Sequence, residues 1–180
     1  ISHTLTKCGA RIGAIYRSDS QTAEATLTEL RNINDVNHFI LQADIANEHA
    51  VEAAVQSAQA QFGGKIDILI LDAAQVVYGE FIATSTADWM RSFDTNVHGA
   101  FFVVRAAVPY LQRGGSVIFL SSGAGHDPMA ELSAYGASKA AANHLSTVLA
   151  QELGPKGIRV NTVSPGHTDK SGNDPNADPQ

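Results

Sequence analysis

The sequence predicts an α/β protein: a three-layer, doubly wound parallel sheet of Rossmann-like type that is incomplete. Short apolar runs alternate along the chain with longer stretches whose apolar residues recur at helical spacing. The run Ile66–Leu71 is apolar at almost every position, which is typical of a central parallel strand with both faces covered. Because crossovers between parallel strands are right-handed, this alternation favours helices on both faces of one sheet.

Each element is expected where the apolar spacing fits it. The predicted strands are Arg11–Tyr16, His38–Gln42, Ile66–Leu71, Ser116–Leu120 and Ile158–Val163. The predicted helices are Ile1–Lys7 (the end of a helix), Ser20–Asn32, Asn47–Phe62, Thr86–Gln112 and Ser133–Leu153. Asn47 is of a type that caps helices and Gly63-Gly64 of a type that stops them, so these residues should bound the third helix.

Length and charge restrict the range of functions. The 180 residues favour one domain, expected over residues 1–170, followed by a disordered or surface tail at 171–180 (SGNDPNADPQ). The chain starts Ile1-Ser2-His3 without the features of a signal peptide, so we expect it to be part of a longer protein. A net charge of -6 without a basic run disfavours binding to nucleic acid or to an anionic membrane.

The cysteine and histidine patterns narrow the range further. Cys8 is the single cysteine, which excludes an intrachain disulfide and fits a cytoplasmic, reducing location. We expect its side chain to be small, buried and hydrophobic in behaviour. No apolar run approaches the roughly 20 residues that a membrane-spanning helix needs. The seven histidines show no spacing typical of a metal site, so we predict none.

Polar residues follow the predicted strands at the edge where a doubly wound sheet binds its ligands. In such folds the ligand lies outside the carboxyl ends of the strands. The segments at these ends are Tyr16-Arg17-Ser18, Ala43-Asp44-Ile45, Asp72-Ala73-Ala74-Gln75, Ser121-Ser122-Gly123 and Ser164-Pro165-Gly166. We therefore expect them to converge on one crevice.

The pair Tyr135 and Lys139 gives the sharpest chemical signal. Residues at i and i+4 lie on one face of a helix. A nearby ammonium favours the phenolate form of a tyrosine, which can then exchange a proton with a carbonyl or alcohol oxygen near neutral pH. That is half of a hydride-transfer reaction, and a nicotinamide cofactor supplies the other half. The alternative is a solvated surface pair, which chance often produces.

Four co-linear segments make the chain resemble the short-chain dehydrogenase/reductase family, classical type, truncated at both ends. The segments are Thr95–Gly99 (TNVHG), Leu120–Gly123 (LSSG), Tyr135–Ala141 (YGASKAA) and Ile158–Gly166 (IRVNTVSPG). The resemblance runs from about Gly9 to Gly166. It implies an oxidoreductase that transfers a hydride between NADP(H) and a carbonyl or secondary alcohol. The implied catalytic residues are Asn96, Ser122, Tyr135 and Lys139.

Each catalytic residue has an implied role and a plainer alternative. The resemblance implies that Tyr135 is the general acid or base and that Lys139 tunes it and binds the nicotinamide ribose. Ser122, with Ser121 as its neighbouring candidate, would polarise the substrate carbonyl, or else it only satisfies a turn. Asn96 would hold a water that links the lysine to solvent, or else it only bonds backbone. An amide inside an apolar helix also favours a kink there.

The predicted cofactor residues are Tyr16, Arg17, Ser18, Asp44, Ala74, Tyr135, Lys139, Pro165 and Gly166. Where NAD-binding folds usually carry an acid, this chain has Tyr16-Arg17-Ser18 and no acid before Asp19. An arginine can pair with a 2′-phosphate, which favours NADP over NAD. By resemblance Asp44 contacts the adenine ring, although it equally fits a cap for the helix near Asn47.

The chain also departs from the family. The glycine-rich pyrophosphate loop is absent, and we expect it before Ile1. Asp72-Ala73-Ala74-Gln75 stands where the family typically has Asn-Asn-Ala-Gly, and only Ala74 matches. Two alternatives therefore stay open: a non-catalytic dinucleotide-binding or regulatory protein, and an inactive fragment. By resemblance, the helices near 86–112 and 133–153 form a homodimer or homotetramer interface.

Overall fold

The computed structural model describes residues 1–166, so the predicted tail at 171–180 lies outside the described residues. The chain forms two compact units. The first holds residues 1–69 and 98–115, and the second holds residues 70–97 and the chain from 116 onward. Within the described residues, no helix is long and apolar enough to cross a membrane.

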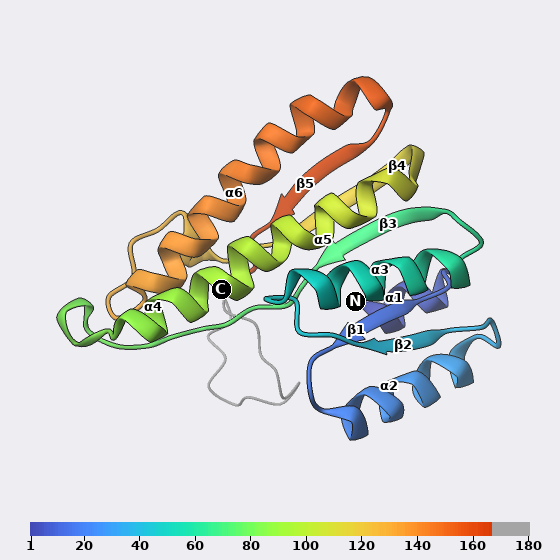
Figure 1. Ribbon diagram of the computed structural model, residues 1–180, viewed down its shortest axis with the longest axis horizontal. Coiled ribbons are helices and arrows are strands. Elements are labelled where there is room, and N and C mark those ends of the chain that lie inside the picture. The colour runs from blue at the N-terminus through green and yellow to red at the C-terminus, as the bar shows by residue number, and fades with distance from the viewer. Residues whose placement is uncertain (167–180) are drawn as a thin grey trace. The chain divides into compact units, whose positions relative to one another are not determined.

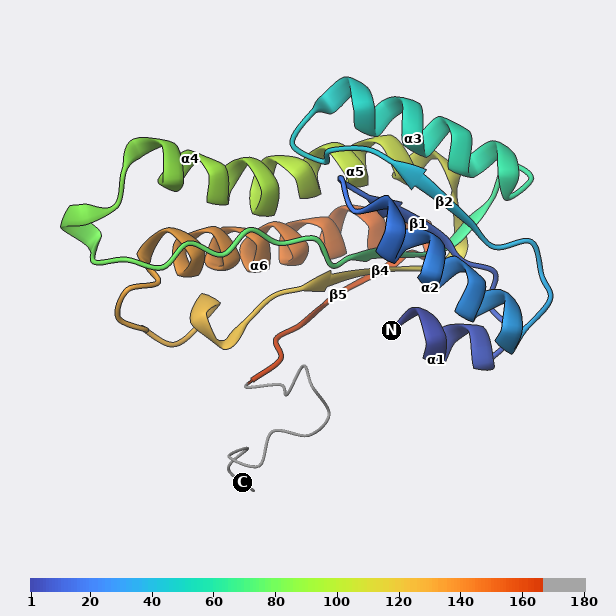
Figure 2. The ribbon, with the colours of Figure 1, turned by 90° about the horizontal axis from the view of Figure 1, so that it is seen from below.

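The first unit contains two parallel strands with helices on both sides. β1 (Gly13–Tyr16) pairs with β2 (Phe39–Gln42), Gly13 opposite Phe39 and Tyr16 opposite Gln42. The helices of this unit are α1 (Ser2–Lys7), α2 (Ser20–Ile33), α3 (Glu48–Gln61) and α5 (Ala100–Ala107). In both views α3 lies on one side of the strand pair and α2 on the other (Figures 1 and 2).

Local chemistry sets the helix boundaries of this unit. The Asn47 side chain accepts a hydrogen bond from the backbone N–H of Ala50 at 3.1 Å, so it caps α3 as predicted. Gly63 and Gly64 follow α3 with φ values of 77° and 88°. Only glycine adopts this left-handed backbone without steric cost, so the predicted stop is confirmed as well.

A buried histidine anchors the start of the strand pair. His38 is fully buried, and its Nδ1 accepts from the backbone N–H of Ile12 at 3.0 Å. Its Nε2 lies 3.1 Å from the carbonyl oxygen of Asn34. A carbonyl can only accept, so Nε2 carries the hydrogen and the ring holds one tautomer. The core beside it is aliphatic, with Leu27, Leu30, Val51, Ala54, Val55, Val103, Val104 and Ala107 buried.

Cys8 and β3 differ from their expected surroundings. Cys8 is exposed, so the prediction of a buried thiol is wrong. On β3 (Ile66–Leu71) Ile68 is 45% exposed, although the apolar run predicted cover on both faces. The strands pair as β1-β2 and as β3-β4-β5, which leaves β3 at an edge of its sheet. In the classic order 3-2-1-4-5-6 these groups correspond to 3-2 and 4-5-6, and strand 1 has no counterpart in residues 1–166.

The second unit is built around the longest helix. β4 (Leu111–Leu120) and β5 (Arg159–Val163) are parallel, with Leu120 opposite Val163. α6 (Ser133–Leu153) matches its predicted bounds. It lies between β5 and α4 (Thr86–Phe93), as Figure 2 shows.

The predicted helix 86–112 is several elements, and that prediction is corrected. α4 ends at Phe93, a π-helix follows at Asp94–Gly99, α5 ends at Ala107, and a 3₁₀ turn covers Val108–Tyr110. Leu111 and Gln112 already belong to β4. Proline lacks a backbone N–H and clashes with the preceding turn, so Pro109 ends the α-helical bonding. A kink was predicted around Asn96, and the structure has a π-helical turn at that place.

Candidate functional site

Tyr135 and Lys139 meet on one face of α6. The Nζ atom of Lys139 lies 5.7 Å from the centroid of the Tyr135 ring. Lys139 is 4% exposed, and its Nζ donates to the backbone oxygen of Leu120 at 2.6 Å. The tyrosine is half-buried. The geometry therefore excludes the alternative of a solvated surface pair for the lysine.

Two opposing effects act on the Lys139 ammonium. Burial, the larger effect, lowers the pKa of Lys139 below its ordinary value of 10.5, because the charged form loses its hydration. The carboxylate of Asp72 acts in the other direction and raises this pKa. The pKa of Lys139 is therefore closer to neutral pH than that of a surface lysine.

Glycines bring the turn after Ser122 against the first turns of α6. A Cβ at Gly136 would lie 2.7 Å from the backbone oxygen of Ala124. A Cβ at Gly125 would lie 3.0 Å from Cβ of Lys139. Both contacts are closer than side chains tolerate, so this approach depends on glycine at each position. The 3₁₀ turn Gly123–Gly125 is thereby held beside the Tyr135–Lys139 pair.

Ser122 stands at the start of that turn. Its Oγ accepts from the backbone N–H of Ala124 at 3.3 Å, so the turn-satisfying role considered above is present. Accepting one bond leaves the hydroxyl hydrogen able to donate to a ligand. Ser122 is half-buried, whereas Ser121 is 7% exposed and its Oγ is buried without a partner among the described residues. Accessibility therefore favours Ser122 over Ser121.

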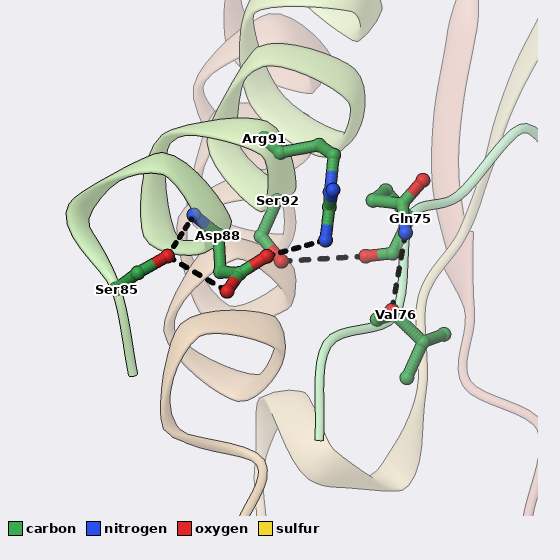
Figure 3. Close-up of polar contacts among 6 residues, drawn as sticks. All are labelled: Gln75, Val76, Ser85, Asp88, Arg91 and Ser92. Carbon is green, nitrogen blue, oxygen red and sulfur yellow. Dashed lines mark hydrogen bonds and ion pairs between the residues drawn. The ribbon is translucent and has the colours of Figure 1, made fainter. Parts of the chain in front are cut away.

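Both polar atoms of the Asn96 side chain are hydrogen-bonded to other residues of the protein. Asn96 is 4% exposed, and its Oδ1 accepts from the backbone N–H of Gln75 at 2.7 Å. Its Nδ2 donates to the backbone oxygen of Gln75 at 3.0 Å and to Ser138 Oγ at 2.9 Å. Ser92 adds a 3.4 Å bond to the same backbone oxygen, as Figure 3 shows. Asn96 thus fastens the segment after β3 to α6.

Ser138 is a site residue that the sequence analysis missed. It is fully buried, accepts from Asn96 and donates to the backbone oxygen of Tyr135 at 2.7 Å. Its place three residues after Tyr135 and one before Lys139 was a usable signal, since i and i+3 share a helix face. The hydroxyl links Asn96 to the turn that carries the tyrosine.

The loop after β5 joins the same region. The backbone N–H of Gly123 donates to the oxygen of Pro165 at 3.3 Å, which places Pro165 beside the Ser122 turn. His126 Nε2 lies 3.1 Å from Ser164 Oγ and 3.1 Å from Asn143 Nδ2, contacts that no sequence motif signalled. Gly166 ends the described chain.

The remaining cofactor candidate of this unit lies in the segment after β3. Ala74 is exposed there, one residue before the clamped Gln75. No group of three or more His, Cys, Asp or Glu side chains suited to a metal ion occurs among residues 1–166.

Four predicted cofactor residues lie in the first unit. Tyr16 ends β1, and Arg17 and Ser18 follow it with exposed side chains. Asp19 is committed to capping α2: its carboxylate accepts from the backbone N–H of Thr22 at 2.9 Å and from the Thr22 hydroxyl at 2.7 Å. These two bonds, the backbone one first, lower the pKa of Asp19.

The structure excludes one of the two roles predicted for Asp44. Its Oδ1 accepts from the backbone N–H of Ala46 at 3.0 Å, within the turn after β2. Asn47 supplies the cap of α3, so the capping alternative for Asp44 is wrong. Its carboxylate is exposed at the strand end, where the adenine contact was predicted.

The sequence matches the model of the short chain dehydrogenase family over residues 1–179. It is 32% identical over 169 residues to the short chain dehydrogenase/reductase AacuN of Aspergillus aculeatus, covering 93% of this chain and 63% of that protein. It is 31% identical over 168 residues to the 3-oxoacyl-(acyl-carrier-protein) reductase FabG of Staphylococcus aureus, covering 92% and 68%. The chain thus spans about two thirds of the length of these relatives.

Several solved structures have a backbone fold similar to that of this chain. A dehydrogenase/reductase from Sinorhizobium meliloti has a TM-score of 0.89 at 30% identity, covering 93% of this chain and 66% of that one. A short chain dehydrogenase from Burkholderia cenocepacia in complex with NADP has 0.88 at 32%, covering 93% and 68%. An NAD⁺-bound xylitol dehydrogenase has 0.87 at 30%, covering 92% and 64%. The predicted Rossmann-like fold class is therefore confirmed, and the chain belongs to the short chain dehydrogenase family.

Proposed function

We propose that the protein is an oxidoreductase that transfers a hydride between NADP(H) and a carbonyl or secondary alcohol, with Tyr135 as general acid and base. The observation that carries this proposal is the buried Lys139 ammonium 5.7 Å from the Tyr135 ring. A cation at this place stabilises the negative charge that forms on the tyrosine oxygen when its proton passes to the substrate. The family to which the chain belongs supports the same reaction class.

The residues of the second unit each have a place in the proposed reaction. NADP(H), when bound, supplies or takes up the hydride. In the reducing direction Tyr135 Oη gives its proton to the substrate oxygen and becomes a phenolate, which the Lys139 ammonium stabilises. Ser122 donates its hydroxyl hydrogen to the same oxygen as negative charge develops there. In the oxidising direction Tyr135 takes the alcohol proton back.

In the proposed reaction, the role of Asn96 is to position neighbouring residues. Both hydrogens of its amide and its Oδ1 are bound by Gln75 and Ser138, so the side chain orients its neighbours. Asn96 therefore fixes the segment after β3 and, through Ser138, the Tyr135 turn. We call it a positioning residue in the proposed site.

Two observations support NADP over NAD. Arg17 follows β1 with an exposed side chain that can pair with a 2′-phosphate. Asp19, the first acid after that strand, is held in a helix cap by two hydrogen bonds. One solved relative is an NADP complex, although another holds NAD⁺, so the family as such is compatible with both.

Replacing Tyr135 by phenylalanine tests the proposed acid. We expect Tyr135→Phe in the full-length protein to lower kcat by roughly 10²-fold or more, because positioned proton transfer contributes about that much. NADPH affinity should stay nearly unchanged, as measured by fluorescence titration. Tyr110→Phe, on the 3₁₀ turn of the first unit, is the matched control and should keep wild-type turnover. Wild-type kcat in Tyr135→Phe would exclude this tyrosine as the acid.

Replacing Arg17 tests the cofactor preference. We expect Arg17→Ala to lower kcat/KM for NADPH by about tenfold or more while leaving kcat/KM for NADH unchanged, since a charged bond to the 2′-phosphate is lost. Arg113→Ala, an exposed arginine at the start of β4, should change neither value. Equal losses with both cofactors would contradict the proposed phosphate contact.

A cytoplasmic, reducing location is also part of the proposal. Cys8 is the single cysteine and its side chain is exposed, so the chain carries no intrachain disulfide that an oxidising compartment would have to form.

A further inference from the structure

We propose that Asp72, at the strand end next to the one that binds Lys139, is the counter-charge of the buried Lys139 ammonium. The catalytic consequence of this pairing rests on the function proposed above. Asp72 acts through Lys139, so it is a positioning residue.

The strand order brings Asp72 towards the lysine. Asp72 is the first residue after β3, and β3 is hydrogen-bonded to β4 in the order β3-β4-β5. Leu120 is the last residue of β4, and its backbone oxygen holds Lys139 Nζ at 2.6 Å. The carboxyl ends of neighbouring parallel strands lie side by side, so Asp72 follows the strand end adjacent to the one that binds the ammonium.

A second tether holds the same segment against α6. Gln75, three residues after Asp72, has its backbone N–H and oxygen both bound by Asn96. Asn96 in turn donates to Ser138, the residue directly before Lys139. The segment that carries Asp72 is therefore fixed at both ends, once by β3 and once by the Asn96–Ser138 contact.

Lys139 needs such a partner because of its burial. Taking an ammonium out of water is unfavourable unless charge or hydrogen bonds offset the lost hydration. One backbone oxygen at 2.6 Å offsets part of it, and the Asp72 carboxylate raises the pKa that burial lowers. The exposed carboxylate keeps its own hydration, so the pairing carries no second desolvation cost.

Several other titratable groups packed near α6 have contacts of their own. Asp88 and Arg91 on α4 form an ion pair with each other (Figure 3), and Asp94 has an interaction of its own. His126 is bound to Ser164 and Asn143. On α6 itself Tyr135 is the partner already described, and Arg159 stands at the opposite end of β5. Asp72 is the carboxylate that acts on Lys139.

This assignment explains a departure from the family. The family typically has an asparagine at the position of Asp72, and an amide carries no charge. Replacing that amide by a carboxylate changes the electrostatics of the site while nearly keeping the side-chain shape. We infer that this chain holds its lysine charged to a higher pH than a relative with asparagine there.

The substitution Asp72→Asn, which introduces the family's residue, is the test. The full-length protein is labelled with ¹³C at the lysine ε-carbons, and the Lys139 resonance is assigned by its loss in Lys139→Arg. We expect the titration midpoint of this resonance to move to lower pH in Asp72→Asn and to stay near the wild-type value in Asp72→Glu. The matched control is Asp67→Asn, the same change at the exposed start of β3, which should leave the midpoint in place.

Turnover gives the second readout. Because a neutral Lys139 no longer stabilises the Tyr135 phenolate, the alkaline limb of the pH profile of kcat should move to lower pH in Asp72→Asn. An unchanged Lys139 midpoint in Asp72→Asn, or an equal shift in Asp67→Asn, overturns the inference. The lysine titration requires no turnover, so an inactive wild type would overturn the proposed function while the midpoint still decides the Asp72 pairing.

Discussion

Lys139 is the residue on which the site's electrostatics depend, and its burial has a consequence for stability. Burial lowers its pKa in the folded protein below the 10.5 of an exposed lysine. Below the lowered pKa, folded and unfolded chains both hold the proton. Between that pKa and 10.5 the unfolded chain binds more protons than the folded one, so the folded state gains stability as pH rises.

The variant Lys139→Met, which does not titrate, makes this gain visible. We expect the free energy of unfolding of wild type minus that of Lys139→Met to rise as pH approaches 10.5, as measured by urea denaturation at a series of pH values. The matched control is Lys65→Met, the same change at an exposed lysine after α3. A flat difference for Lys139→Met would mean that the lysine is hydrated in solution.

For individual residues, the sequence predicted the Tyr135–Lys139 geometry because helix periodicity alone places residues four apart on one face. It could not predict the partner of Lys139 Nζ, since the Leu120 oxygen is a backbone atom that any residue could present. The same holds for two of the three bonds of Asn96, which go to the backbone of Gln75. A side chain that hydrogen-bonds to backbone requires no particular residue type as its partner, so the sequence pattern does not reveal the contact.

Among the elements, α6 and the turn Gly123–Gly125 pack closely together. We expect Gly136→Ala to destabilise the protein by about 1–3 kcal/mol, because its Cβ would meet the backbone oxygen of Ala124 at 2.7 Å, and backbone cannot move aside cheaply. Thermal unfolding followed by circular dichroism measures the effect. Gly154→Ala is the control, since that Cβ would enter open space and should leave stability equal or slightly higher.

An equal melting temperature in both glycine variants would show that α6 moves freely over the turn. A loss confined to Gly136→Ala would confirm the close approach that holds Ser122 beside the tyrosine.

Element boundaries were predictable where local chemistry fixes them. The cap Asn47, the stop at Gly63-Gly64 and the bounds of α6 all followed from residue type and spacing. The stretch 86–112 was misread because its apolar residues stay close to helical spacing, and a single π turn shifts that spacing too little to stand out in the pattern. β4 starts five residues earlier than predicted, where Gln112 to Gly114 carry no apolar signal.

For the whole molecule, the open prediction concerns self-association. On α6, Val148 remains 39% exposed, and on α5, Phe101 remains 44% exposed. These are the helices on which a homodimer or homotetramer interface was predicted. Exposed apolar side chains on a helix face are typical of interfaces between subunits.

We therefore expect the full-length protein to elute as a dimer or tetramer and Val148→Arg to shift it to lower mass, as measured by size-exclusion chromatography with light scattering. The circular dichroism spectrum should not change, because Val148 is exposed within the chain. Thr28→Arg on the exposed face of α2 is the control. A wild-type monomer would contradict the prediction outright.

The fold class was readable from the alternation of elements, since strand and helix periodicities differ strongly. The pairing of strands in two groups was not, because hydrogen-bonding between strands depends on neighbours that lie far apart in sequence. The substrate could not be read from the sequence either, since the segment between Ser122 and Tyr135 mixes apolar and charged residues such as Met129, Glu131 and Leu132.

The bond from Lys139 Nζ to Leu120 has a stereochemical consequence. The three hydrogens of an ammonium and the carbon that carries it form a tetrahedron around the nitrogen. The backbone oxygen at the strand end accepts one of these hydrogens. The two that remain point away from β4, so oxygen atoms of a bound molecule can reach the cation from one side only. In the proposed reaction, a ketone oxygen would therefore meet the ammonium from a fixed direction relative to the phenol, and this single backbone contact would contribute to the handedness of the alcohol formed.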